Sequence, residues 1–238
     1  EGDSYKDQKT YWLNKLSGEL PTLDLVNSNQ RPKVKTFNGN TLSTHLSPEF
    51  TTRLKTFCKS NGGSSFMALL SLWNTLFFKY TSKRDIIIGS PVACRDHKDL
   101  ESQIGFYLNT LALRNSIDPD QPFILFYEQI KKSTSEAFKN QFYPFDRLVT
   151  DLKLKQDVSR NAIFDAMLTF QTSSAMHTST YKDDAEYERI EDLGPSLAKF
   201  DIDISFLEQG NDMTLSVNYN ADVYEKFFIE NLINNFLY

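Results

Sequence analysis

The segment FMALLSLWNTLFFKY, residues 66–80, constrains the fold most, because a helix built from it is apolar on nearly every side. Such a pattern is typical of a helix that the fold buries rather than one that lies on the surface. Its apolar part is shorter than the roughly 20 residues that a membrane-spanning helix needs, and Ser71, Asn74 and Thr75 interrupt it. The rest of the chain must therefore cover this helix.

The remaining segments alternate between helical and strand patterns. Ser47 before Pro48 and Glu49 is a typical helix start, and Ser64 or Ser65 can cap the apolar helix. The patterns predict helices over residues 5–17, 48–60, 66–80, 118–139, 144–153 and 223–238. They predict strands over residues 37–47, 85–93, 104–114 and 161–171, and a hairpin over residues 198–220.

This order favours an α/β protein with a mixed β-sheet flanked by helices, since helices and strands alternate until the final hairpin. Residues 20–35 contain two prolines and no sustained period, so we expect an extended connector there. Residues 173–188 turn polar, and we expect them to form a surface loop. No convincing internal domain boundary follows.

Composition limits the partners of the chain. A net charge of −5 without a basic stripe gives no reason to expect nucleic-acid binding. Cys58 and Cys94 cannot form a C-x-x-C site and are expected to be reduced thiols. The first ten residues are polar and contain no signal-peptide core. We therefore expect a soluble, cytoplasmic protein with no membrane or nucleic-acid partner.

The sequence contains no self-contained catalytic or metal-binding motif. The three histidines, His45, His97 and His177, are far apart along the chain. H-E-x-x-H, G-x-S-x-G, Walker and G-x-G-x-x-G patterns do not occur. We expect no catalytic residue and no metal site in this chain.

The stretch IGFYLNTLALR, residues 104–114, places an amide and a hydroxyl in apolar surroundings. Burying an unpartnered amide costs roughly 1–3 kcal/mol, so these groups need partners or a task. Strand alternation puts Asn109 and Thr110 on opposite faces of the sheet. Either Asn109 bonds the backbone of a neighbouring loop and organises the fold, or its face borders a polar channel.

In NQFYPFDRL, residues 140–148, proline is expected to set a turn before a helix. The residues expected in the core are Phe142, Phe145 and Leu148. Tyr143, which precedes Pro144, is expected to be extended.

Two further stretches carry charged residues beside predicted strands. In DVSRNAIF, a pair between Asp157 and Arg160 is expected to hold a turn. In KFDIDISF, alternation places Asp201 and Asp203 on the face opposite the large apolar side chains. We expect Asp203 to be solvated, whereas the pattern leaves the environment of Asp201 open.

In the order in which they occur, three of these stretches resemble motifs in the C-terminal half of condensation domains from nonribosomal peptide synthetases. IGFYLNTLALR is similar to I-G-x-F-V-N-T-L-x-x-R, NQFYPFDRLV to H/N-Q-D-x-P-F-E, and QDVSRNAIFDAMLTFQ to R-D-x-S-R-N-P-L-F. The resemblance runs from about Tyr11 to Tyr238. The residues that depart from the family's patterns are Tyr107, Leu108, Phe142, Asp146, Gln156 and Ala162.

The resemblance implies a chloramphenicol-acetyltransferase-like (CoA-dependent acyltransferase) lobe over residues 36–238, preceded by an inter-lobe connector over residues 1–35. In this family two lobes enclose a channel, which admits the phosphopantetheine arms of two carrier proteins, and a peptide bond forms between their thioester-bound substrates. The implied partners are the N-terminal lobe, upstream and downstream peptidyl carrier proteins and an adjacent adenylation domain, with no cofactor bound directly. The implied channel-wall or motif residues are Asn109, Thr110, Arg114, Gln141, Pro144, Phe145, Ser159, Arg160, Asn161 and Asp201.

The family's H-H-x-x-x-D-G motif, whose second histidine is held to act at the acceptor amine, has no counterpart in this sequence. The resemblance therefore implies a fragment that is inactive alone and active as part of its parent synthetase. Two alternatives remain: the equivalent lobe of an epimerisation or cyclisation domain, or a noncatalytic scaffold that recruits carrier proteins.

Overall fold

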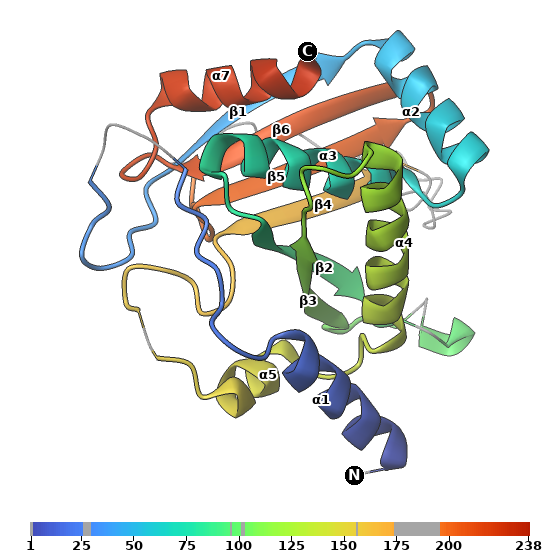
Figure 1. The fold of residues 1–238 in the computed structure, drawn as a ribbon, viewed down its shortest axis with the longest axis vertical. Coiled ribbons are helices and arrows are strands. Elements are labelled where there is room, and N and C mark those ends of the chain that lie inside the picture. The colour runs from blue at the N-terminus through green and yellow to red at the C-terminus, as the bar shows by residue number, and fades with distance from the viewer. Residues whose placement is uncertain (1, 26–29, 96, 101–102, 156, 174–195) are drawn as a thin grey trace.

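The computed structural model describes residues 2–25, 30–95, 97–100, 103–155, 157–173 and 196–238. Their strands form one six-stranded mixed sheet in the order β1-β6-β5-β4-β2-β3 (Figure 1). The strands are β1 (Gly39–Leu46), β2 (Asp85–Ala93), β3 (Leu108–Ser116), β4 (Ala166–Thr172), β5 (Ile202–Gln209) and β6 (Asp212–Asn220). The β2–β4 and β4–β5 pairs are parallel and the others antiparallel, which confirms the predicted α/β class with a mixed sheet.

Six α-helices and one short 3₁₀ helix accompany the sheet within the described residues. They are α1 (Asp3–Lys15), α2 (Pro48–Asn61), α3 (Ser65–Thr81), η1 (Lys98–Leu100), α4 (Phe123–Lys139), α5 (Phe145–Leu152) and α7 (Lys226–Leu237). The Ser47 hydroxyl accepts a hydrogen bond from the Phe50 N–H (3.1 Å), as the start signal predicts. Of the two serines that could cap α3, Ser64 does so, accepting from the Met67 N–H (3.3 Å).

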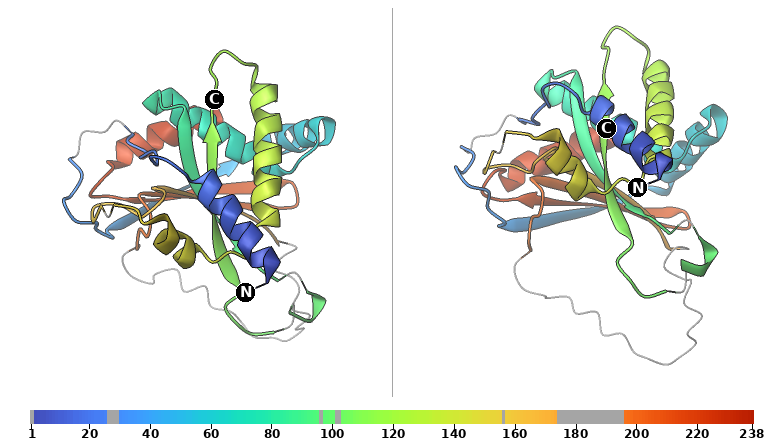
Figure 2. Two further views of the ribbon diagram at one scale, coloured as in Figure 1. Left: turned by 60° about the horizontal axis from the view of Figure 1, so that its bottom comes forward. Right: turned by 90° about the horizontal axis from the view of Figure 1, so that it is seen from below.

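Helix α3 is buried on most of its circumference, as its apolar pattern predicts. Seen from below the view of Figure 1, α2, α3, α4 and α7 all lie on one side of the sheet (Figure 2). The polar interruptions Ser71 and Asn74 donate within the helix to the Met67 and Leu70 carbonyls, whereas the buried Oδ1 of Asn74 accepts no hydrogen bond from the described residues. No helix among the described residues has the length and apolar character to span a bilayer.

Several predicted boundaries are wrong, and three of them have a clear local cause. Strand β3 begins at Leu108 rather than residue 104, because the Arg95 guanidinium lies over the Tyr107 ring (4.2 Å) and bonds the Gln103 carbonyl, holding the preceding residues as a loop. Helix α4 begins at Phe123 rather than residue 118, because residues 118–121 form a turn. Strand β4 begins at Ala166 rather than residue 161, because residues 157–160 also form a turn.

The two faces of the sheet differ in chemistry. The helix-covered face presents buried apolar side chains, including Leu46, Leu215, Ile204, Leu168, Ile88 and Leu113. We call the opposite side the second face. The strand register aligns six residues across it: Thr41, Asn218, Asp203, Met167, Gly89 and Ala112.

Gly89 lets an aromatic ring lie directly on the second face. A Cβ at this position would lie 2.2 Å from two atoms of the Phe164 ring. That ring also stacks on Phe200 and packs against Phe145, each with centroids 5.6 Å apart. A side chain at residue 89 would therefore displace the aromatic row that links the start of α5 to the sheet.

We predict that Gly89→Ala lowers the free energy of unfolding by about 3 kcal/mol, because one extra methyl overpacks this contact. Urea unfolding of wild type and variant measures the loss. The same substitution is also made in a Phe164→Leu protein, because the smaller side chain leaves room for the added methyl group. A Gly89→Ala effect equally large in both backgrounds would contradict the proposed clash.

Candidate functional site

Asn109, near the start of β3, uses both the nitrogen and the oxygen of its side-chain amide to bind one loop. Its Nδ2 donates to the carbonyls of Gln141 (2.7 Å) and Tyr143 (2.9 Å), and its Oδ1 accepts from the Phe145 N–H (3.0 Å). These bonds hold the segment between α4 and α5 against the sheet and satisfy a backbone donor at the start of α5. Asn109 therefore braces the fold, which is the first of the two alternatives that the sequence left open.

The same loop corrects one core assignment. Phe142 is 41% exposed, whereas Tyr143 is 1% exposed. Pro144 lies at the N-cap position of α5 with an extended backbone. The Tyr143 ring directly before it packs inward against Tyr5, with ring centroids 5.2 Å apart. The sequence motif locates the turn but does not say which aromatic faces inward.

Arg114, at the other end of β3, ties down the segment that follows α1. It forms a bidentate pair with Asp85 (3.1 and 2.7 Å) and donates to the carbonyls of Ser17 (2.7 Å) and Glu19 (3.0 Å). All three guanidinium nitrogens are therefore engaged with protein groups, and this residue acts as a brace.

Two buried carboxylates stand at the edge of the second face. Asp165 and Asp201 are 4% and 1% exposed, and the Asp201 N–H donates to the Asp165 carbonyl (3.0 Å). Arg160 pairs with Asp165 (2.7 Å), and Arg31 pairs with Asp201. Burial, reinforced by the negative charge of Asp201, raises the pKa of Asp165 despite the two arginines.

The predicted connector contacts both carboxylates and one of their arginine partners. Arg31 belongs to it, Arg160 also pairs with Asp24, and the Leu23 N–H donates to Asp165 (3.1 Å). Partial burial opposes ionisation of Asp24, but hydrogen bonds from Thr22 and Lys83 and the charge of Arg160 outweigh it. They lower the pKa of Asp24 to about 2.

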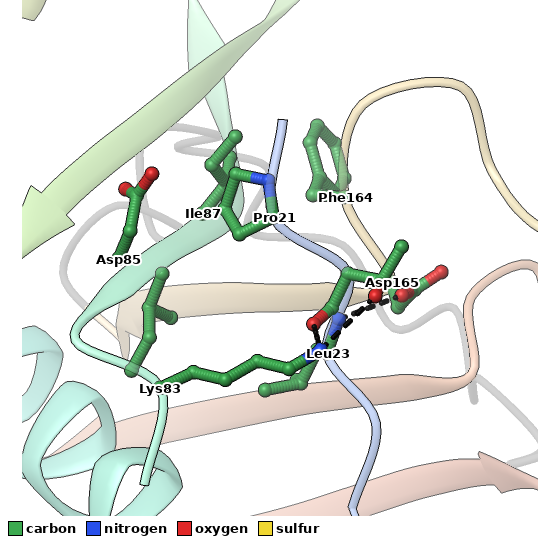
Figure 3. A pocket seen from close by; sticks show the side chains of 9 residues that line it. Pro21, Leu23, Lys83, Asp85, Ile87, Phe164 and Asp165 are labelled. Carbon is green, nitrogen blue, oxygen red and sulfur yellow. Dashed lines mark hydrogen bonds between the residues drawn. The ribbon is translucent and has the colours of Figure 1, made fainter. Parts of the chain in front are cut away.

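Figure 3 shows where the connector contacts the sheet, including the hydrogen bond from the Leu23 N–H to Asp165. The cavity beneath it measures about 10 Å³, room for about one water molecule. Its labelled lining residues are Pro21, Leu23, Lys83, Asp85, Ile87, Phe164 and Asp165. The contact is packed and leaves no space for a substrate.

The SRN segment between α5 and β4 completes this attachment. The Ser159 hydroxyl bonds Asp157 (2.6 Å), and the Ser159 carbonyl accepts from Arg31 (3.2 Å). Asn161 accepts from Lys35. The predicted pair between Asp157 and Arg160 is present but long (3.7 Å), so Arg160 mainly serves Asp165 and Asp24.

The rest of the second face is polar, and no described helix lies over it. Asn218 donates to the hydroxyls of Thr41 (3.0 Å) and Ser196 (2.6 Å). In the adjacent row the hydroxyls of Ser43 and Ser216 lie 2.8 Å apart. We call this surface the polar face; its residues are Thr41, Ser43, Thr110, Thr169, Asp203, Ser205, Ser216 and Asn218, all half-buried or exposed.

Asp203 lies in the middle of the polar face. The expectation that it is solvated is wrong: it is half-buried, and this burial raises its pKa to about 6 although Lys199 opposes the shift. Alternation identifies its face but does not reveal how far the neighbouring strands bury it. The structure therefore brings Thr110 and Asp203 to the polar face, and places Arg114, Ser159, Arg160, Asn161 and Asp201 around the connector.

Comparison with known proteins gives one consistent family. The family model described as "Condensation domain" matches residues 1–238. Bacitracin synthase 2 of Bacillus licheniformis is 36% identical over 234 residues, which cover 98% of this chain and 9% of that protein. The chain therefore spans a small part of such relatives.

Solved structures share the fold. The X-domain from teicoplanin biosynthesis superposes with a TM-score of 0.87 at 22% identity, over 100% of this chain and 54% of that one. The four-domain nonribosomal peptide synthetase holo-AB3403, bound to AMP and glycine, gives 0.81 at 20% identity, over 99% of this chain and 19% of that one.

We predict that Asn109→Asp lowers the free energy of unfolding by about 3 kcal/mol, because a carboxylate oxygen would replace the donor that faces two carbonyls. Chemical denaturation measures it, with hydrogen exchange at Phe145 as a local readout. Asn40→Asp is the control, since Asn40 uses only its oxygen, accepting from the Thr41 N–H (2.8 Å). Equal effects of the two substitutions would refute the role of the amide donor.

We predict that Asp203→Asn raises stability at pH 7. The folded-state pKa of about 6 lies above the ordinary value of 3.8, so the ionised form is disfavoured in the folded chain. The advantage of the variant should shrink as pH falls through 6 and vanish near 4, where Asp203 is protonated in the folded state. Thermal or urea unfolding between pH 4 and 8 measures it. Asp212→Asn, at an exposed position of the same hairpin, is the control. If the stability difference between Asp203→Asn and wild type did not change with pH, or changed equally for Asp212→Asn, the burial effect would be contradicted.

Proposed function

The chain belongs to the condensation-domain family, and we propose that it forms the C-terminal lobe of a nonribosomal peptide synthetase condensation domain, with residues 1–35 as connector and residues 36–238 as lobe. The observation that carries the proposal is the second face. The connector is fastened across one end of it by buried ion pairs, and the remainder is a polar surface that no described helix covers. Such a surface suits one wall of a channel that another lobe closes.

In the proposed reaction the amine of the downstream aminoacyl substrate attacks the thioester carbonyl of the upstream substrate. A C–N bond forms, the C–S bond breaks, the thiol of the upstream phosphopantetheine arm leaves, and the amine loses a proton. Because both reactants arrive tethered to carrier proteins, positioning supplies much of the rate. The reaction then needs proton handling near the amine and polar groups near the developing oxyanion.

This chain supplies positioning. We infer that Thr110 on the polar face contributes to the channel wall. Asn109, with Gln141, Pro144 and Phe145, shapes the adjoining loop. Five residues of the lobe hold the connector and so fix its position relative to the sheet: Arg114, Ser159, Arg160, Asn161 and Asp201. Proton handling belongs to the histidine motif of the other lobe, which this sequence lacks.

The proposed partners follow from this reaction. They are the N-terminal lobe of the same domain, the upstream and downstream peptidyl carrier proteins and the adjacent adenylation domain. No cofactor binds the chain directly; the phosphopantetheine arms belong to the carrier proteins.

A second candidate is a recruitment scaffold. It is favoured by the likeness to the X-domain in its complex with OxyB from teicoplanin biosynthesis, which has a TM-score of 0.85 at 21% identity over 98% of this chain and 51% of that one. Under this alternative the polar face would bind a separate protein instead of tethered substrates.

We predict that the parent condensation domain joins two aminoacyl groups presented on loaded carrier proteins, and that the 238-residue chain alone does not. Mass spectrometry of the downstream carrier protein detects the dipeptidyl thioester. Substituting the histidines of the parent's H-H-x-x-x-D-G motif provides the inactive control. Product formed by the chain alone would refute the assignment of proton handling to the other lobe. A parent domain that makes no product yet binds a separate protein would favour the scaffold.

A further inference from the structure

We propose that Asp203 is a specificity-determining residue that binds a cationic group, a primary ammonium or a guanidinium, on a substrate held against the polar face. The inference rests on the proposed function, because it takes the polar face as channel wall. Beyond the proposed function, Asp203 would select substrates that carry a positively charged group.

The position of Asp203 is central. Strand β5 is the third strand from the β1 edge, and the residues aligned with Asp203 on either side are Asn218 and Met167. The next residue of β5 on this face is Ser205, whose hydroxyl bonds the Ser216 carbonyl (3.4 Å). Asp203 is thus one negative charge set among neutral hydroxyl, amide and thioether side chains.

The carboxylate of Asp203 has no hydrogen bond or ion pair with any described residue. Lys199 acts on it electrostatically but forms no ion pair with it. The neighbouring Asn218 amide donates to Thr41 and Ser196 instead. Within the part of the chain that the structure describes, both carboxylate oxygens therefore lack a hydrogen-bond donor.

The contrast with the other aspartates on this side of the sheet is informative. Asp165 and Asp201 are each paired with an arginine inside the fold. Asp203 is left half-buried and uncompensated, which costs folding free energy that an asparagine or serine would not cost. Carboxylates in such surroundings are typical of functional sites, where a ligand supplies the missing charge.

The chemistry selects a cation. An ammonium or guanidinium would form a charge-assisted hydrogen bond and compensate the buried charge. A neutral hydroxyl would leave the charge uncompensated, and a carboxylate would be repelled. With pKa about 6, the side chain is mostly ionised at pH 7 and able to bind a cation.

The test compares a basic with a neutral substrate in the parent condensation domain. Carrier proteins are loaded with ornithine or with norvaline, which lacks the terminal amine, and each is supplied in turn as donor and as acceptor. We expect wild type to favour ornithine at one of the two positions by about tenfold in kcat/KM, mainly through KM. Asp203→Asn should bring this ratio close to one, mainly by raising KM for the ornithine substrate. Asp212→Asn, on the same hairpin, should leave the ratio unchanged.

A second measurement does not depend on turnover. Titration of the ¹⁵N-labelled parent domain with n-butylammonium should shift the Asn218 side-chain amide saturably in wild type and not in Asp203→Asn, and n-butanol should have no effect in either. No saturable shift, or equal shifts in wild type and Asp203→Asn, would overturn the inference.

The kinetic outcomes distinguish a failure of the Asp203 role from a failure of the proposed condensation function. Condensation of both substrates with no ornithine preference, or a preference that survives in Asp203→Asn, overturns the role of Asp203 and leaves the proposed function standing. No condensation of either substrate, at either position, refutes the proposed function and with it the inference.

Discussion

The arrangement of this fold depends on two buried carboxylates whose negative charges need positive partners. Asp165 and Asp201 lie side by side where β4 and β5 begin, and neither can remain ionised there without a positive partner. Removing one partner of such a buried pair costs about 3–5 kcal/mol, because the remaining charge is left uncompensated. Since Arg31 comes from the connector and Arg160 also binds Asp24 of the connector, these charges position the connector as well as the sheet.

This electrostatic requirement divides the second face into two parts. At one end, the connector and the aromatic row of Phe145, Phe164 and Phe200 close the surface tightly. Beyond Gly89 and Met167 the same face carries hydroxyls, an amide and a carboxylate. The helix-covered face supplies the core, so the polar part of the second face is free to be specialised for binding.

Much of this fold could be predicted from local signals. The caps at Ser47 and Ser64, the buried helix α3 and the final hairpin each depend on residues close together in sequence. The charged cluster could not be predicted in the same way, because Arg31 and Asp201 are 170 residues apart. The motif around Arg160 marked the right segment, but its short-range partner Asp157 is the weaker of the contacts that form.

The residues that sequence reasoning placed wrongly share a physical cause. Phe142 and Asp203 each follow a correct local pattern, a turn before Pro144 and a strand of period two, yet their exposure depends on what distant elements cover. Asn109 has the opposite character: its three hydrogen bonds use every group that made it conspicuous, so little is left for a substrate. Polar residues that the fold fully satisfies are braces, and a half-buried charge that it leaves unsatisfied is where a ligand has something to supply. On that criterion, the side chain best suited to the proposed ligand contact is the Asp203 carboxylate on β5, which lies outside the three family-like motifs.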